Sequence, residues 1–326
     1  MKFQLNRYYM HIAAVATLII VAITGYFIFD SYHNIQQEKL DILLSIALLF
    51  VLILLFTLVY LMKKNREKLF NSLLEQHKIE NEMMDAKRIQ MGILPDDQVL
   101  KGLSEAIEIH GSLTTARIVG GDLYDYRYRD GKLIFCIGDV SGKGLSAAVY
   151  MTAVTAVFRL MATRFHSPSK IVSVINDAFV GYNSDCMFVT MIVGSLDCES
   201  GVLTYTNAGH NPPVIIKENG AGFVPLPKGT PVGFFKDAAY TELQLTLAPG
   251  EKILLYTDGV TEAHNEKGEL FGGRRLKNVC SELYGKSLTE VVDCVSLAVD
   301  NFASKAEQAD DITMLCISNN LKDTLN

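Results

Sequence analysis

The 326-residue chain lacks the cysteine pattern of a disulfide or zinc framework. Its six cysteines are scattered, with no Cys-x-x-Cys pair and no histidine beside any of them. Such spacing is typical of reduced thiols in a cytosolic core. The second half of the chain also lacks a long basic run, and the net charge is −6. Together these features argue against nucleic-acid binding.

A phosphate-binding P-loop is also missing, although one glycine-rich turn invites the comparison. Residues 135–149 read FCIGDVSGKGLSAAV, and the glycine-lysine spacing differs from that of the P-loop motif. Asp139 in this turn would repel a phosphate unless a cation stood between them. The turn therefore directs attention to a cation and to its other ligands.

Charged residues are missing from two long apolar runs near the start of the chain. Residues 12–29 and 42–62 contain none, and each run is close to the roughly 20 residues that a helix needs to cross a bilayer. The alternative for the first run is a cleaved signal peptide, but no Ala-x-Ala site follows it and a second run comes soon after. Lysine and arginine flank the pair on its outer sides, which predicts cytoplasmic termini. We expect a two-span hairpin over residues 1–62 in the cell (inner) membrane.

Residues 63–95 predict a helical stalk. The segment is rich in helix-forming residues, has no proline before Pro95, and repeats apolar residues at an approximate three-four spacing. Gln76 and His77 interrupt the repeat. We expect the stalks of two chains to form a coiled coil, which would make the protein a homodimer. The alternative is a single amphipathic helix that packs on its own domain. The stretch is too short for a two-helix HAMP relay.

Acidic residues recur where an apolar or β-favouring run meets a turn. They are Asp122 in GGDLYDY, Asp139 in the turn above, Asp258 in YTDGVTEA, and Asp310 and Asp311 in EQADDITML. Carboxylates suit hard cations such as Mg²⁺ or Mn²⁺. Each acid alone is typical of a turn or cap, but the set indicates a two-metal centre that activates water. No covalent nucleophile is evident, because Ser141 lacks a nucleophile-elbow context and Cys136 lies inside a strand-like run.

The order of the motifs resembles that of one phosphatase family. GGDLYDY, GDVSGKG, MFVTMIVGSLD, YTNAGHNPPV, LLYTDGVTEAHNEKGELFG and DDITML follow one another as in the bacterial branch of the metal-dependent serine/threonine phosphatases (PPM), the stage II sporulation E protein and RsbU-like branch. The resemblance runs from about Ala86 to Ser318. It implies an α+β fold over residues 96–320, an α/β/β/α sandwich of two antiparallel sheets flanked by helices, with residues 321–326 as a tail.

The resemblance also implies two Mn²⁺ or Mg²⁺ ions and roles for individual residues. Asp139 matches the aspartate that bridges the two metals, and Asp122 matches a carboxylate that acts through metal-bound water. Asp311 stands where many relatives have asparagine. The residues expected to be catalytic are Asp122, Asp139, Asp258 and Asp310, and the expected metal ligands are these four with the carbonyl of Val140 and with Asp311.

Two departures from the wider superfamily affect the expected chemistry. Ser141 occupies the place where eukaryotic members carry a histidine suited to general-acid work. Arg117 is the nearest candidate for their phosphate-binding arginine. Lys143 either approaches the substrate phosphate or is a solvated residue that opens a helix. His210 in NAGHNPP is either an acid-base group or, as we favour, a structural hydrogen-bonding residue.

The resulting hypothesis is a membrane-tethered phosphatase acting on phosphoserine or phosphothreonine of a cytoplasmic protein. By resemblance, the substrate is a phosphorylated STAS-domain antagonist of an anti-sigma factor, and the stalk couples signals to dimer geometry and metal occupancy. One alternative is a non-catalytic signalling scaffold, which the intact set of aspartates disfavours. Another is a diguanylate cyclase, suggested by GGD, but Leu123 and Tyr124 replace the Glu-Phe of that signature.

Overall fold

The computed structural model describes residues 2–32, 37–95, 107–181 and 186–320. Contacts divide the chain into two units, Met1–Ile79 and Glu80–Asn326, so that the boundary falls inside the predicted stalk. The predicted tail and the first residues of the predicted sandwich domain, 96–106, lie outside the described residues.

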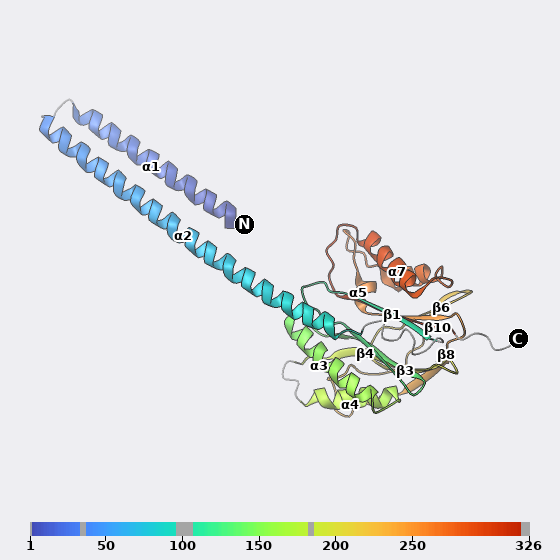
Figure 1. The fold of residues 1–326 in the computed structure, drawn as a ribbon. Coiled ribbons are helices and arrows are strands. Elements are labelled where there is room, and N and C mark those ends of the chain that lie inside the picture. Colours follow the sequence, from blue (N-terminus) through green and yellow to red (C-terminus); the bar gives the residue numbers. More distant parts are fainter. Residues whose placement is uncertain (1, 33–36, 96–106, 182–185, 321–326) are drawn as a thin grey trace. The chain divides into compact units, whose positions relative to one another are not determined.

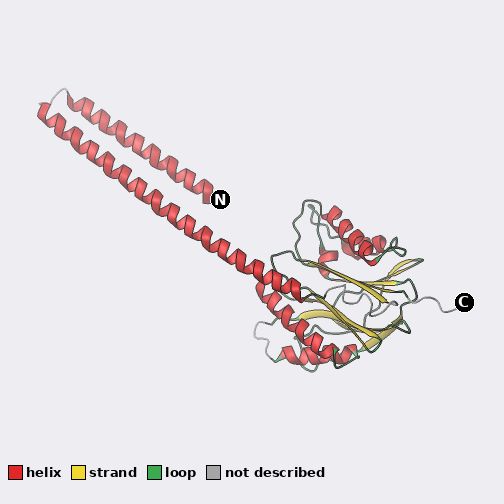
Figure 2. Cartoon of the chain, viewed as in Figure 1, coloured by secondary structure: helices red, strands yellow, loops and turns green. Residues whose placement is uncertain are grey.

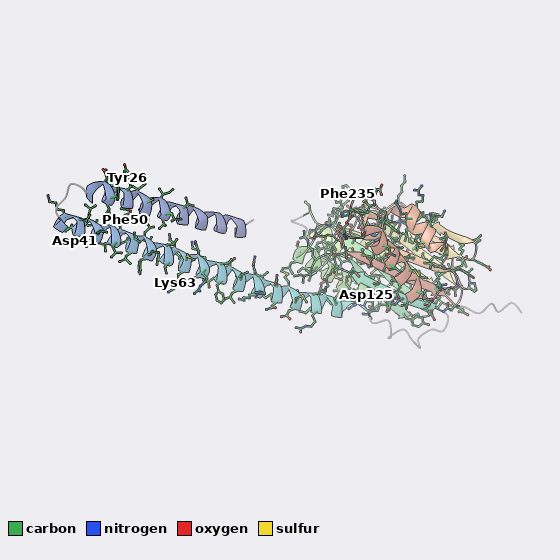
Figure 3. The ribbon with its side chains drawn as sticks, turned by 90° about the horizontal axis from the view of Figure 1, so that it is seen from above. Tyr26, Asp41, Phe50, Lys63, Asp125 and Phe235 are labelled. Carbon is green, nitrogen blue, oxygen red and sulfur yellow. The ribbon has the colours of Figure 1, made fainter. Side chains whose placement is uncertain are left out.

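The first unit consists of helices, and among its described residues most large apolar side chains are exposed. α1 (Lys2–Tyr32) lies alongside the first part of α2 (Gln37–Ile93), as Figure 1 shows. The most apolar window of α2 has a mean hydropathy of 3.2, and none of it is buried. Tyr26 and Phe50, labelled in Figure 3, are 69% and 52% exposed. By length and composition α2 can cross a membrane, whereas the apolar part of α1 is shorter.

The second unit contains two five-stranded antiparallel sheets (Figure 2). The first sheet has the order β2 (Leu123–Arg129), β3 (Lys132–Val140), β4 (Val189–Asp197), β5 (Val202–Ala208), β8 (Glu242–Thr246). The second has the order β1 (Ile107–Thr114), β10 (Ile312–Asn319), β9 (Lys252–Tyr256), β6 (Val214–Lys217), β7 (Gly220–Phe223).

Helices cover the outer face of each sheet. α3 (Leu145–Ala162) and α4 (Pro168–Val180) pack on the first sheet, and α6 (Gly272–Cys280) and α7 (Leu288–Ala303) pack on the second. A short helix, α5 (Asp258–Glu262), follows β9. The expected α/β/β/α sandwich is confirmed. α3 passes the same length and composition test as a membrane span, but nearly half of its window is buried, and it forms part of a core.

Alternation along the strands explains the layers. In β3, Phe135 and Ile137 face the core between the sheets, while Ile134 and Cys136 face the helices above them. Successive side chains of a strand point to opposite faces, so Asp139 continues the row that faces the inter-sheet core. Its carboxylate therefore lies at the end of that core.

One carboxylate of the edge strand β8 holds the start of α4. Glu242 Oε1 accepts hydrogen bonds from Ser167 Oγ (2.6 Å), Ser169 N (2.9 Å) and Ser169 Oγ (2.8 Å). Burial by itself would raise the pKa of Glu242, but these hydrogen bonds lower it overall. The ionised carboxylate is therefore the form that stabilises the fold.

We expect Glu242→Gln to lower the free energy of unfolding by about 1 kcal/mol at pH 7. Because the folded-state pKa is lowered, the contribution is complete above the unfolded value of 4.5 and is lost as the pH falls through the folded value. Urea unfolding followed by circular dichroism at pH 7 and pH 3 measures this difference. Glu199→Gln, at an exposed turn, serves as the control. An equal loss at both pH values would contradict the assignment.

Candidate metal centre

Four of the predicted aspartates lie at the same end of the sandwich. The start of β2 pairs with the end of β3, and the start of β10 pairs with the end of β9. Asp139 is in β3 and Asp122 directly precedes β2, both of the first sheet. Asp258 begins α5 just after β9, and Asp310 precedes β10, both strands of the second sheet. The strand pairing brings these acids to one end of the two sheets, where the charges of Asp258 and Asp310 raise the pKa of Asp139.

Asp122 is held across the two sheets by hydroxyl groups. Its side chain is buried, and Oδ2 accepts hydrogen bonds from Thr257 Oγ1 at 2.7 Å and Thr313 Oγ1 at 2.6 Å. Burial and then the charge of Asp139 raise the pKa of Asp122 well above its ordinary value, while the two threonines oppose that shift. Sequence reasoning assigned no role to Thr257 or Thr313. The sequence offers one indication: Thr313 is a polar residue two positions before Leu315, so both side chains point into the core between the sheets.

Asp139 has a raised pKa because it is buried among other carboxylates. Burial and the charges of Asp258 and Asp310 together raise the pKa of Asp139 to about 7, although a hydrogen bond with Asp122 opposes the shift. Burial also raises the pKa of Asp258, and the charge of Glu262 contributes. Carboxylates that cannot ionise together without a counter-charge are a donor set that suits a hard divalent cation.

The carboxylates are close to one another without converging on one point. Within the described ranges, no three His, Cys, Asp or Glu side chains form a group that could hold a metal ion as they stand. Like charges repel, and several of these oxygens already accept protein hydrogen bonds. The donor chemistry thus fits divalent cations, and the individual ligand assignments stay predictions.

Asp311 has both carboxylate oxygens occupied by backbone amides. Oδ1 accepts from Ala116 N and Oδ2 accepts from Gly121 N, each at 2.8 Å. A Cβ atom on Gly120 would lie 1.9 Å from Asp311 Oδ2, so this close approach requires glycine. Asp311 therefore holds the segment that leads into Asp122 and explains Gly120, whereas a Cβ atom on Gly121 would lie 2.9 Å from Val140 O.

The two expected phosphate-binding cations have different surroundings. Lys143 Nζ lies 2.8 Å from Asp310 Oδ2 and donates to Ala309 O at 2.7 Å. The exposed Arg117 lies beside the turn after β3, since a Cβ atom on Gly144 would be 3.9 Å from Arg117 Nη1. Lys143 is thus engaged by an expected metal ligand, while Arg117 is exposed beside the same turn.

Ser141 and His210 both form structural contacts at this end. Ser141 Oγ accepts from Phe188 N at 2.9 Å and Ser141 N donates to Phe188 O at 2.8 Å, which fixes the turn after β3. His210 is buried, with Nδ1 2.9 Å from Thr190 Oγ1. Burial lowers the pKa of His210 to about 4, so its imidazole is neutral near pH 7. These contacts agree with the structural interpretation of His210.

The last turns of α2 contact the segment that carries the first aspartate. Gln90 is 3% exposed; its Nε2 donates to Gly120 O at 2.7 Å, and its Oε1 accepts from Gly120 N at 3.3 Å. Arg159 of α3 donates to Ile93 O and to the buried Asp125, which Figure 3 labels. Sequence reasoning did not single out Gln90, because a polar helix residue is usually solvated.

The chain matches one protein-family model and is similar to curated proteins. The family model of stage II sporulation protein E (SpoIIE) matches residues 129–320, more than half of the chain. Protein IcfG of Synechocystis sp. (strain ATCC 27184 / PCC 6803 / Kazusa) is 29% identical over 267 residues, covering 73% of this chain and 42% of IcfG. Phosphoserine phosphatase RsbU of Bacillus subtilis (strain 168) is 31% identical over 198 residues, covering 60% of this chain and 58% of RsbU. The chain spans about half the length of these curated relatives.

A solved structure shares the sandwich. The SiaA-PP2C domain of Pseudomonas aeruginosa has a TM-score of 0.66 at 24% identity, covering 74% of this chain and 97% of that domain. At this identity the likeness supports the fold alone. The family assignment rests on the family model, because its match runs from the end of β2 through β10, the last strand of the sandwich. The chain belongs to the stage II sporulation protein E (SpoIIE) family.

Proposed function

We propose that this chain is a metal-dependent protein phosphatase that hydrolyses phosphoserine or phosphothreonine. The observation that carries the proposal is the gathering of Asp122, Asp139, Asp258 and Asp310 at one end of the sandwich, with the charges of two of them acting on Asp139. The name of the relative RsbU, a phosphoserine phosphatase, supports the reaction class. The competing function, a signalling scaffold, would not need so crowded a set of acids.

Two Mn²⁺ or Mg²⁺ ions, when bound, would supply an activated water and neutralise charge on the phosphoryl group. The residues that would hold them are Asp139, the carbonyl of Val140, Asp258, Asp310, Asp311 and, through metal-bound water, Asp122. Thr257 and Thr313 keep the Asp122 carboxylate oriented toward the inter-sheet end. Arg117, exposed beside the turn after β3, would bind a phosphate oxygen of the substrate.

The proposed substrate is a phosphorylated STAS-domain protein that antagonises an anti-sigma factor. Support comes from the family and from the motif order. The test is phosphate release from a phosphorylated STAS-domain protein by the full chain with Mn²⁺, compared with an unrelated phosphoprotein. Equal or absent release from the two would remove the substrate assignment. If the full chain releases phosphate from neither phosphoprotein and from no phosphopeptide, the protein-phosphatase assignment is wrong.

We further propose that residues 1–62 tether the chain to the cell membrane and that residues 63–95 form a stalk. The sandwich, residues 96–320, would then lie in the cytoplasm, followed by a tail over residues 321–326. The exposed apolar window of α2 supports the tether. A homodimer through the stalk would give the membrane end a means of altering the sandwich. Fractionation of cells and crosslinking through single cysteines introduced in the stalk test these two points.

Gln90 provides a physical link for such coupling, and its removal has a defined expectation. Gln90→Ala leaves the buried N–H and C=O of Gly120 without their partners, which costs about 1–3 kcal/mol for an unsatisfied buried group. We expect Mn²⁺ affinity and activity to fall about tenfold, since Gly120 lies two residues before Asp122. Calorimetric titration with Mn²⁺ measures the affinity.

The control is Asn81→Ala, which also removes an amide side chain, at an exposed position of the same helix. It should leave Mn²⁺ affinity unchanged. If Asn81→Ala and Gln90→Ala weaken binding equally, the effect comes from the helix in general and the specific link to Gly120 is wrong.

A further inference from the structure

A cavity of about 310 Å³ adjoins the metal centre. It lies between the end of α5, the end of α7 and the segment that leads into β10, and Asp310 and Lys143 form part of its wall. Its apolar lining includes Val299, Ala303 and Ile312. A phosphorylated residue that reaches the metal centre would therefore place neighbouring residues of its own chain beside this cavity.

The charged lining is predominantly acidic. Glu262, Asp300 and Glu307 line the cavity, and all three side chains are solvent-exposed. The only ammonium in the lining, that of Lys143, is already paired with Asp310. In the part of the chain that the structure describes, none of the three other carboxylates has an ion-pair partner. The cavity thus offers uncompensated negative charge around an apolar floor.

We propose that this cavity binds an arginine or lysine side chain of the phosphoprotein, close in sequence to the phosphorylated residue. The proposal rests on the proposed function, because it specifies the substrate of the same site. Long basic side chains place their aliphatic stem on apolar surface and their charge in a polar rim. The apolar floor and acidic rim of the cavity match both parts of such a side chain. An acidic side chain would be repelled by the same rim.

The experiment uses the full chain in mild detergent with Mn²⁺ and a set of neutral phosphoserine peptides. Each peptide carries one arginine at one of the six positions nearest the phosphoserine, and its matched partner carries glutamine there. We expect arginine at one position, or at two adjacent positions, to raise kcat/KM about fivefold, the size of one favourable ion pair near a surface. If arginine and glutamine peptides react equally at every position, the proposal is wrong.

Variants of the rim locate the effect. Asp300→Asn combined with Glu307→Gln should abolish the preference for arginine and leave turnover of the glutamine peptide unchanged. Glu199→Gln combined with Glu218→Gln removes the same charge from exposed sites outside the cavity and should retain the preference. Glu307→Lys should reverse it, so that glutamate at the same peptide position is favoured. Equal loss in the two double variants would mean that net charge, and not this cavity, sets the preference.

A binding measurement separates this proposal from the proposed function. Fluorescence anisotropy of the same peptides with the Asp139→Asn full chain reports docking without turnover. If arginine strengthens binding and the rim variants abolish this effect, the cavity assignment is supported, whether or not the parent protein hydrolyses the peptides. If the parent protein hydrolyses no peptide, the protein-phosphatase assignment is wrong. If the parent protein hydrolyses all peptides and the Asp139→Asn chain binds arginine and glutamine peptides equally, the cavity assignment is wrong and the phosphatase assignment stands.

Discussion

Asp139→Asn is expected to lower Mn²⁺-dependent hydrolysis of p-nitrophenyl phosphate by about a thousandfold. Asp139 lies at the end of the inter-sheet core, where the charges of Asp258 and Asp310 act on it. Asparagine keeps the size of the side chain but removes the negative charge that would bridge the two cations. Steady-state rates of the full chain and the variant, at saturating Mn²⁺, give the comparison.

The control for this change is Asp237→Asn, at an exposed position with a φ of 59°, a conformation that asparagine tolerates. It should hydrolyse the substrate at the parental rate. Circular dichroism shows whether Asp139→Asn is folded, which we expect because the change removes a buried charge. If the folded variant is as active as the parent protein, the phosphatase function is wrong and the signalling scaffold becomes the better hypothesis.

Local sequence was sufficient to predict the positions of the main acids. Asp139 and Asp258 each follow an apolar run and lie beside glycine, so the ends of strands were recognisable without any tertiary information. The order of the motifs then implied the sandwich, which the structure confirms. That the acids share one end of it follows from antiparallel pairing, since the end of one strand lies beside the start of its neighbour.

The contacts that orient those acids were not predictable in the same way. Thr257 and Thr313 reach Asp122 from the other sheet, more than a hundred residues away in sequence. Asp311 binds backbone amides of a distant segment with both oxygens, a role that its neighbour Asp310 does not share. Such pairings depend on how two sheets stack, and no local pattern encodes that. α3 meets the length and composition criteria of a membrane span, and its burial in a core shows that it is part of the sandwich.

The stability of the metal-free chain is expected to fall as the pH rises from about 4 to about 7. Burial and neighbouring charges raise the pKa of Asp139 from 3.8 to about 7 in the folded state. Between these values the folded protein binds a proton that the unfolded chain has released, so each increase in pH favours unfolding. For a shift of this size the loss is on the order of 3 kcal/mol. The raised pKa of Asp122 acts in the same direction.

Divalent cations should reverse this trend, because they stabilise the ionised carboxylates and exclude the protons. We therefore expect Mn²⁺ to raise the melting temperature of the full chain strongly at pH 8 and only slightly at pH 5.5, with EDTA cancelling the increase. Asp139→Asn should flatten the pH dependence of the metal-free protein and remove most of the Mn²⁺ effect, whereas Asp237→Asn should retain both. A Mn²⁺ effect of equal size at the two pH values, or one that survives Asp139→Asn, would mean that the ions bind elsewhere than among these aspartates.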